Sequence, residues 1–298
     1  AGELPNYDML YDRPEITVEP SHYAWHAFHI DEDLTRRLKK FARTEGTTLY
    51  AVCLSALQIL LTRYTAQEDT AVVTPVFGRS RARFARTVGD FVNMLVLREN
   101  LQPELTGLEL LARTKQTLLE ALAHQDYPYA RLVADIRSAR QGPRSPLAQV
   151  LFVLQQFKLL AELDLRMGVS TGAVPNVPFL AWDAYVIPQQ SGQFDLCLEL
   201  AESKDGLSGY VEYKDALFGE ERITRMQEHF VRLLQELVSH PTDRIVSLPL
   251  MSEAETQQTV LAWGQPSGTA DHELCLHRMI EKQARRTPEA VAVEQGGQ

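Results

Sequence analysis

The segment 48–64 constrains the fold most, because apolar residues surround nearly its whole helical circumference. Val52, Leu54, Leu57 and Leu61 recur too densely to occupy one face alone. A helix of this kind is stable only when neighbouring elements cover it on every side. With 298 residues, 45% of them apolar, the chain is long enough to build that cover as a sizeable core.

Short apolar strands alternate along the chain with amphipathic helices. We expect strands at 23–30, 70–76, 91–98, 150–155, 179–187, 193–200 and 207–213, and helices at 34–45, 48–64, 106–123, 128–136, 220–238 and 274–286. The nearly continuous apolar run 150–155 is typical of a central strand. This interleaving predicts a two-layer α/β unit.

The stretch that begins at Gly89 combines a strand pattern with a polar residue that plain core would not carry. Alternation puts Phe91 and Asn93 on one face of the expected strand, with Val92 and Met94 on the other. A half-buried amide must use its donors and acceptor on specific partners. Two interpretations stay open: Asn93 satisfies neighbouring backbone groups, or its amide faces a substrate.

The charge balance argues against a nucleic-acid partner. The net charge is −9 and the pI about 5.4, and no basic stripe stands out beyond the cluster from Arg79 to Arg83. That cluster is either a solvated loop or a phosphate contact. Its surroundings predict a polar loop between two strands.

Cysteine usage and hydropathy indicate a cytoplasmic protein. Cys53, Cys197 and Cys275 are widely spaced, which predicts neither a zinc site nor a disulfide framework. No window approaches the roughly 20 apolar residues that a membrane span needs, and residues 1–12 do not form a signal peptide.

Five short motifs in one order carry a family resemblance. The run from Gly89 to Arg98 resembles the Gly-x-Phe-Val-Asn-Thr-Leu-x-x-Arg signature of the condensation domains of non-ribosomal peptide synthetases, with Met94 in place of Thr. Four further motifs are similar to the same family: Gly78-Arg79, His124-Gln125-Asp126-Tyr127-Pro128-Tyr129, Arg144-Ser145-Pro146-Leu147 and Gln193-Phe194-Asp195-Leu196. Ala130, Gln193 and the extra residues in 138–143 depart from the family pattern, which puts the subtype in doubt.

The resemblance implies a lobe of the chloramphenicol-acetyltransferase-like fold, a mixed sheet packed with helices. Two such lobes form a V, and carrier-borne phosphopantetheine arms enter the cleft between them. The reaction joins a donor acyl or peptidyl thioester to an acceptor aminoacyl amine, with no metal and no directly bound cofactor.

The family's His-His-x-x-x-Asp-Gly motif is absent from this chain. No two histidines are adjacent, and in the nearest similar run, from His29 to Asp33, Leu34 stands where Gly is needed for a sharp turn. We therefore expect no catalytic residue here and a C-terminal half that is inactive alone.

The motif order also predicts four segments. Residues 1–20 form an inter-lobe linker, 21–240 the C-terminal lobe, 241–270 a second linker and 271–298 the truncated start of an adenylation domain. The expected partners are an N-terminal lobe, the donor and acceptor carrier domains and the downstream adenylation domain, without nucleic acid or membrane.

Six residues are candidates for the substrate channel or the lobe interface. Asn93 would orient a carbonyl group. Arg79 and Arg98 would position groups across the lobe interface, or simply form ion pairs. Ser145 would line the acceptor channel or open a strand, and Trp182 and Tyr185 would wall a pocket or belong to the core.

Five other motif residues are expected to be structural. Gln125 and Asp126 would end one helix and cap the next, while Gly89, Phe91 and Asp195 would shape their strands. A second function fits the same lobe: a catalytically silent module that recruits a tailoring enzyme or a carrier protein. The residues upstream of Ala1 would discriminate the two, and the identity of the substrates lies beyond this sequence.

Overall fold

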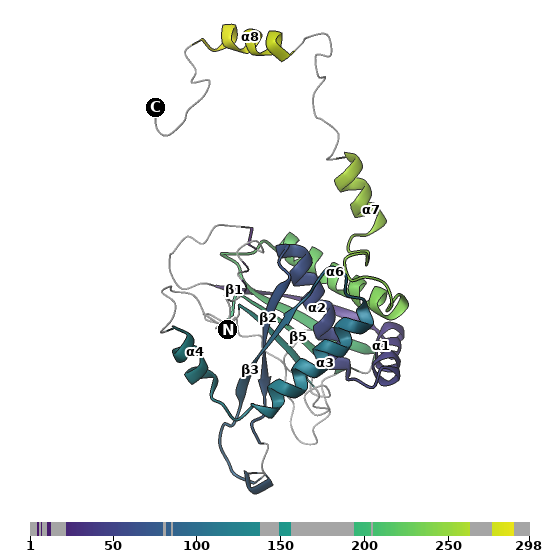
Figure 1. Ribbon diagram of the computed structural model, residues 1–298, viewed down its shortest axis with the longest axis vertical. Coiled ribbons are helices and arrows are strands. Elements are labelled where there is room, and N and C mark those ends of the chain that lie inside the picture. The colour runs from purple at the N-terminus through teal and green to yellow at the C-terminus, as the bar shows by residue number, and fades with distance from the viewer. Residues whose placement is uncertain are drawn as a thin grey trace, which may run out of the picture. The chain divides into compact units, whose positions relative to one another are not determined.

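A computed structural model describes residues 22–79, 82–84, 86–137, 149–155, 194–203, 205–262 and 276–288, together with Pro5, Tyr7, Tyr11 and Asp12. The chain divides into two units, residues 1–250 and 251–298. The first unit contains a sheet with helices packed on it (Figure 1), which is the predicted α/β class. The second unit is described separately below.

Six strands form a mixed sheet in the described part of the first unit. They are β1 (Tyr23–Asp31), β2 (Asp69–Val76), β3 (Asn93–Asn100), β4 (Val150–Gln155), β5 (Leu196–Ser203) and β6 (Gly206–Lys214), in the order β1-β6-β5-β4-β2-β3. Strand β4 pairs in parallel with both β2 and β5, and the other pairs are antiparallel. The prediction that 150–155 is a central strand is therefore confirmed.

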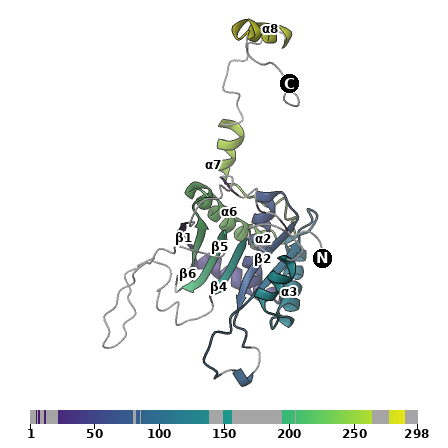
Figure 2. The same ribbon diagram turned by 90° about the vertical axis from the view of Figure 1, so that its left-hand side faces the viewer.

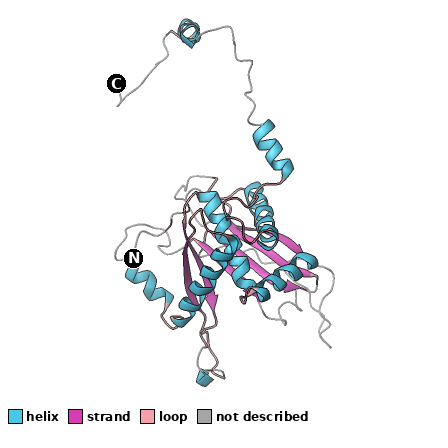
Figure 3. Ribbon diagram, turned by 45° about the vertical axis from the view of Figure 1, so that its right-hand side comes forward, coloured by secondary structure: helices cyan, strands magenta, loops and turns pink. Residues whose placement is uncertain are grey.

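Four helices form a layer on one face of this sheet (Figures 2 and 3). They are α1 (Glu32–Thr44), α2 (Leu49–Thr65), α3 (Gly107–Ala123) and α6 (Glu220–Ser239). Helix α2 contacts α1, α3, α6 and β2, and Leu57 and Ile59, which are two residues apart and so point to opposite sides of the helix, are both buried. The predicted cover around this helix is thus present.

Side-chain caps fix where these helices begin. Asp31 accepts a hydrogen bond from Leu34 N at 2.7 Å, and Thr48 accepts one from Ala51 N at 3.2 Å. Thr106 and Glu109 form the predicted capping box of α3. Asp31 thereby starts α1 directly after β1, and His29 lies on that strand with its Nε2 3.1 Å from the Asp205 carbonyl oxygen.

The opposite face of the sheet carries a smaller apolar cluster. Ala71, Val73 and Phe194 are buried there, with Met94 and Tyr129 packed against them. Tyr129 begins α4 (Tyr129–Arg137), which contacts β3. The short α4 thus lies apart from the layer of α1, α2, α3 and α6 (Figure 1).

Two strands begin two or more residues later than predicted. Strand β3 begins at Asn93, two residues later than predicted, because Asp90 Oδ1 accepts a hydrogen bond from Val92 N at 2.9 Å and closes a local turn. Strand β5 begins at Leu196, three residues later than predicted. The strand expected at 179–187 lies outside the described residues.

The expected linker 1–20 contacts the lobe at three described positions. Tyr7 is fully buried, and its hydroxyl donates to Ala71 O at 3.0 Å. The Tyr11 hydroxyl donates to Asp195 Oδ2 at 2.8 Å. Asp12 accepts from Gly219 N at 2.8 Å and pairs with Arg222, so a carboxylate stabilises the start of α6.

Leu248 is fully buried with Ile245 in the main core, so the first part of the expected linker 241–270 packs on this unit. The second unit contains the short α7 (Glu253–Thr256), the π-helix η3 (Gln257–Ala262) and α8 (Leu276–Arg286). Helix α8 falls within the predicted helix 274–286. The strand expected after it lies outside the described residues.

Candidate functional site

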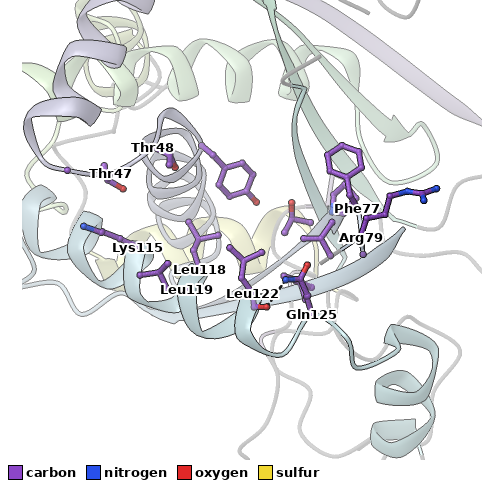
Figure 4. A pocket seen from close by; sticks show the side chains of 16 residues that line it. Thr47, Thr48, Phe77, Arg79, Lys115, Leu118, Leu119, Leu122 and Gln125 are labelled. Carbon is purple, nitrogen blue, oxygen red and sulfur yellow. Dashed lines mark hydrogen bonds between the residues drawn. The ribbon is translucent and has the colours of Figure 1, made fainter. Parts of the chain in front are cut away.

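A cavity of about 580 Å³ lies between the start of α2 and the loop that follows β2. Helix α3 forms one side of it. Figure 4 shows Thr47, Thr48 and Lys115 at one end of it and Phe77 and Arg79 at the other. Leu118, Leu119 and Leu122 project from α3 along its wall (Figure 4). The cavity is therefore mainly apolar in its walls and polar at its ends.

The inner wall carries a buried phenol. The Tyr50 ring lies 5.0 Å from the Phe152 ring, centroid to centroid, and burial raises the pKa of Tyr50, an effect that the nearby Thr74 hydroxyl partly offsets. The Tyr50 hydroxyl is shielded from water and makes no hydrogen bond of ordinary geometry to the part of the chain that the structure describes. A buried donor in this state costs free energy until it finds an acceptor.

Arg79 holds the loop that joins β2 to β3. Its guanidinium donates to the carbonyl oxygens of Phe84, Thr87 and Gly89 at 2.7–3.0 Å, and it lies 4.3 Å from the centroid of the Phe91 ring. Gly78 precedes it with φ +60°, and a Cβ there would approach Phe91 O to 1.9 Å. The Gly-Arg motif thus shapes this loop.

Asn93 connects the start of β3 with the turn between α3 and α4. Its Nδ2 donates to Gln125 O at 2.8 Å and to Tyr127 O at 2.7 Å, and its Oδ1 accepts from Tyr129 N at 3.0 Å. The amide therefore satisfies neighbouring backbone, which is one of the two interpretations left open by the sequence. Through this last bond, Asn93 satisfies the first amide of α4.

Two other motif residues form ion pairs. Arg98 makes a bidentate contact with Asp69 across β2 and β3, and this hydrogen bonding raises the pKa of Arg98. Asp195 is buried and pairs with Lys214 while accepting from Tyr11. Both contacts join neighbouring elements of the lobe.

The remaining predicted residues are divided between the cavity and the undescribed segments. Gln125 lines the cavity and donates through Nε2 to Leu122 O at 3.0 Å. Ser145, Trp182 and Tyr185 lie outside the described residues. The sequence analysis did not identify Tyr50 and Lys115. A signal for this region was present, because Leu118 and Leu119 are consecutive in α3 and cannot both point to its core face.

Six large apolar side chains are exposed around the cavity and the loop after β2. We call this surface the apolar end: Phe77, Val88, Val92, Leu119, Leu122 and Tyr127. Val88 is 99% exposed and Phe77 62%. Phe77, Leu119 and Leu122 share the cavity, and Val92 adjoins Asn93, whose amide donates to Tyr127 O. Val88 lies on the loop between Phe77 and Val92.

The residues that the structure describes give little support for metal or thiol chemistry. No group of three or more His, Cys, Asp or Glu among them could hold a metal ion. Cys53 and Cys197 are free thiols, and burial raises the pKa of Cys53 to about 12, which disfavours the nucleophilic thiolate.

Among the described helices, none alone has the length and apolarity that a membrane span needs. The pair α1 and α2, bent by 105° between them, meets these criteria by length and composition only.

Solved structures resemble this chain in fold. A four-domain nonribosomal peptide synthetase bound to AMP and glycine matches 97% of the chain and 22% of its own length, with a TM-score of 0.76 and 23% identity. The X-domain from teicoplanin biosynthesis matches 81% of the chain and 52% of its own length, with a TM-score of 0.67 and 23% identity. These likenesses establish the chloramphenicol-acetyltransferase-like lobe as the fold.

Sequence relatives are large synthetases. Linear gramicidin synthase subunits B and D of Brevibacillus parabrevis are 36% and 34% identical to this chain, and each match covers 100% of the chain. The chain spans 6% of the length of either relative. Residues 1–260 match the family model described as Condensation domain, and the chain therefore belongs to the condensation-domain family of non-ribosomal peptide synthetases.

Proposed function

We propose that this chain forms the C-terminal lobe of a condensation domain and acts with an N-terminal lobe. Together they would join a carrier-bound acyl or peptidyl thioester to a carrier-bound aminoacyl acceptor. The amine nitrogen would form the new bond to the thioester carbonyl carbon, the C–S bond would break, and the donor arm would leave as a thiol.

The apolar end is the observation that carries this proposal. Exposed apolar residues that gather on one surface mark a site of interaction with another protein, and these lie beside the family signature that begins at Gly89. An N-terminal lobe seated there would cover Val88 and Val92. It would also supply the His-His-x-x-x-Asp-Gly motif that is absent from this sequence, because a positioned base must reach the reacting amine.

Within this assembly, Arg79 and Asn93 act as positioning residues. Their side chains are committed to backbone carbonyls and one amide, so they fix the loop after β2 and the turn at 125–129 beside the apolar end. Arg98, through Asp69, would keep β2 and β3 in register. Ser145, Trp182 and Tyr185 are proposed for the channel wall.

The domain context is part of the same proposal. Residues 241–270 would lead to an adenylation domain whose start is 271–298, and the donor and acceptor carrier domains would bring both substrates on phosphopantetheine. Matching synthetases are far longer than this chain, which is consistent with several domains acting in sequence.

The test is reconstitution from two polypeptides. The chain alone, mixed with loaded donor and acceptor carriers, should give only background peptide in a single-turnover assay. Addition of an N-terminal lobe that contains an intact His-His-x-x-x-Asp-Gly motif should restore amide formation. Condensation by the chain alone would contradict the half-domain assignment, and no condensation with the lobe bound would contradict the function.

A second candidate is a silent module that recruits another protein. One solved structure is a complex of the X-domain and OxyB from teicoplanin biosynthesis, and its chain matches 82% of this one with a TM-score of 0.67. At 22% identity this likeness supports the fold alone. Binding of a tailoring enzyme to the two-lobe assembly, in the absence of amide formation, would favour this candidate.

A further inference from the structure

The cavity beside α3 shares Phe77, Leu119 and Leu122 with the apolar end, and its dimensions suit a ligand. Small-molecule sites commonly enclose roughly 300–1,000 Å³, with apolar walls and a few polar groups. This cavity, at about 580 Å³, lies within that range. Its wall is formed by leucines of α3, and Phe77 and Leu95 extend the apolar lining.

One end of the cavity is positively charged. Lys115 lies close to the turn before α2, since its Nζ is 3.9 Å from the position of a Cβ built on Gly46. No described residue forms an ion pair with Lys115. Helix α2 has no acidic residue in its first turn, whereas α1 has Glu32 and Asp33, so the positive end of α2 is not neutralised there.

The inner wall offers an unused donor. The Tyr50 hydroxyl makes no hydrogen bond of ordinary geometry within the described chain. A ligand oxygen in the cavity would supply its acceptor. The leucine wall and the cation both come from α3, and the donor comes from α2.

We infer that this cavity binds a linear aliphatic compound with one anionic head. Its chain lies along Leu118, Leu119 and Leu122, its head faces Lys115 and the start of α2, and Tyr50 donates to one of its oxygens. Carboxylate and phosphate-ester heads share this chemistry, and the two are separated by experiment.

The test is isothermal titration of the whole chain, without any lobe or carrier, with octanoate, decanoate, decyl phosphate and neutral decanol. Decanoate should bind about tenfold or more tighter than octanoate, since each buried methylene contributes about fourfold. Decanol should bind more weakly than the anions, and added salt should reduce only anion binding. The tighter of decanoate and decyl phosphate identifies the head group.

Three variants locate the site. Lys115→Met should weaken decanoate binding about two- to fivefold, as expected for an exposed charge. Tyr50→Phe should weaken it about two- to tenfold, because it removes the hydroxyl that donates to the head group. Leu119→Asp should weaken decanoate binding more than the other two variants, since it places a carboxylate beside the aliphatic part of a ligand that is itself anionic.

Matched controls keep the result interpretable. Lys40→Met removes one exposed charge from α1, and Ala112→Asp adds one to an exposed position of α3; neither should change binding. Absence of decanoate and decyl phosphate binding, equal binding of decanol, or site variants that behave like their controls would overturn the inference. These outcomes leave the amide-forming proposal untouched, because that assay uses carriers and a second lobe.

Discussion

The core around α2 and the apolar end both contain leucine and phenylalanine, but the described residues cover only the core. Leu57 of α2 is 1% exposed and Leu119 of α3 is 55% exposed. Hydrophobic burial stabilises a fold in proportion to the area removed from water. The same residue type therefore supports folding in one region and offers a contact surface in the other.

The most severe test of this difference compares the unfolding free energies of two variants, Leu57→Ala and Leu119→Ala. Both residues lie within α-helices, so helix propensity contributes equally. We expect Leu57→Ala to cost about 2–5 kcal/mol of unfolding free energy because it leaves a cavity. Leu119→Ala should stay within about 0.5 kcal/mol. Urea unfolding of both variants gives the comparison, and similar midpoints for the two would refute it.

Asn93→Ala tests a polar residue that lies between the two regions. The substitution leaves two carbonyl oxygens and one amide without their partner, so we expect a loss of about 1–3 kcal/mol. Asn100→Ala, at the exposed end of the same strand, is the control and should cost little. Melting temperatures measure both.

The same preparation of Asn93→Ala distinguishes a positioning role from stabilisation alone. In the reconstituted two-lobe assembly, the folded fraction should condense more slowly than the parent if Asn93 positions the turn at 125–129 for function. Parental turnover by a protein that melts early would show that Asn93 only stabilises β3.

Glu212→Gln tests a half-buried carboxyl on β6. Burial, with Glu199 nearby, raises the pKa of Glu212. The folded chain therefore holds this proton to higher pH than the unfolded chain, and stability falls as pH rises from the unfolded pKa through the folded one. Glu212→Gln should raise the melting temperature at neutral pH, and the gain should shrink as the buffer is acidified below the unfolded pKa.

A control for Glu212→Gln is the exposed Glu104→Gln, which removes the same charge from a loop. If both variants shift the melting temperature equally at every pH, the effect comes from net charge and not from burial of Glu212.

Val88→Asp should have the smallest effect on folding and still abolish a function. At 99% exposure, the side chain contributes almost no burial, so the melting temperature should not move. Association with an N-terminal lobe, measured by calorimetry, should weaken strongly because the carboxylate would be desolvated there. Unchanged association would remove Val88 from the interface, and Glu104→Gln serves again as a variant that should bind normally.

Local chemistry explains why much of the fold was predictable. Thr106 with Glu109 and Asp31 mark helix starts through hydrogen bonds that span three residues, so sequence alone contains both partners. The burial of α2 followed from its composition in the same way. The start of β3 was misplaced since the Asp90 turn competes with the apolar alternation that predicted a strand from Phe91.

The candidate site was less predictable because its contacts are long-range. The sequence left two roles for Asn93, and only the turn 32–36 residues later settles which groups its amide contacts. The cavity is lined by residues of α2, β2 and α3, which are distant in the sequence, so no short motif indicates that they come together. Likewise, the Pro-containing segment around Tyr7 gave no sign that this tyrosine reaches Ala71 in the core.

The register of β1 bears on how this lobe is made in the cell. Tyr23 pairs with Lys214. The two positions differ by 191 residues, so β1 is synthesised long before its partner strand β6. At a synthesis rate of about 5–20 residues per second, that interval is roughly 10–40 s. During translation, β1 is an unpaired strand edge while α1 and α2 can already form their local contacts. An unpaired edge of this kind is prone to pair with other chains, so the interval before β6 emerges is the period in which the nascent chain is most exposed to misassembly.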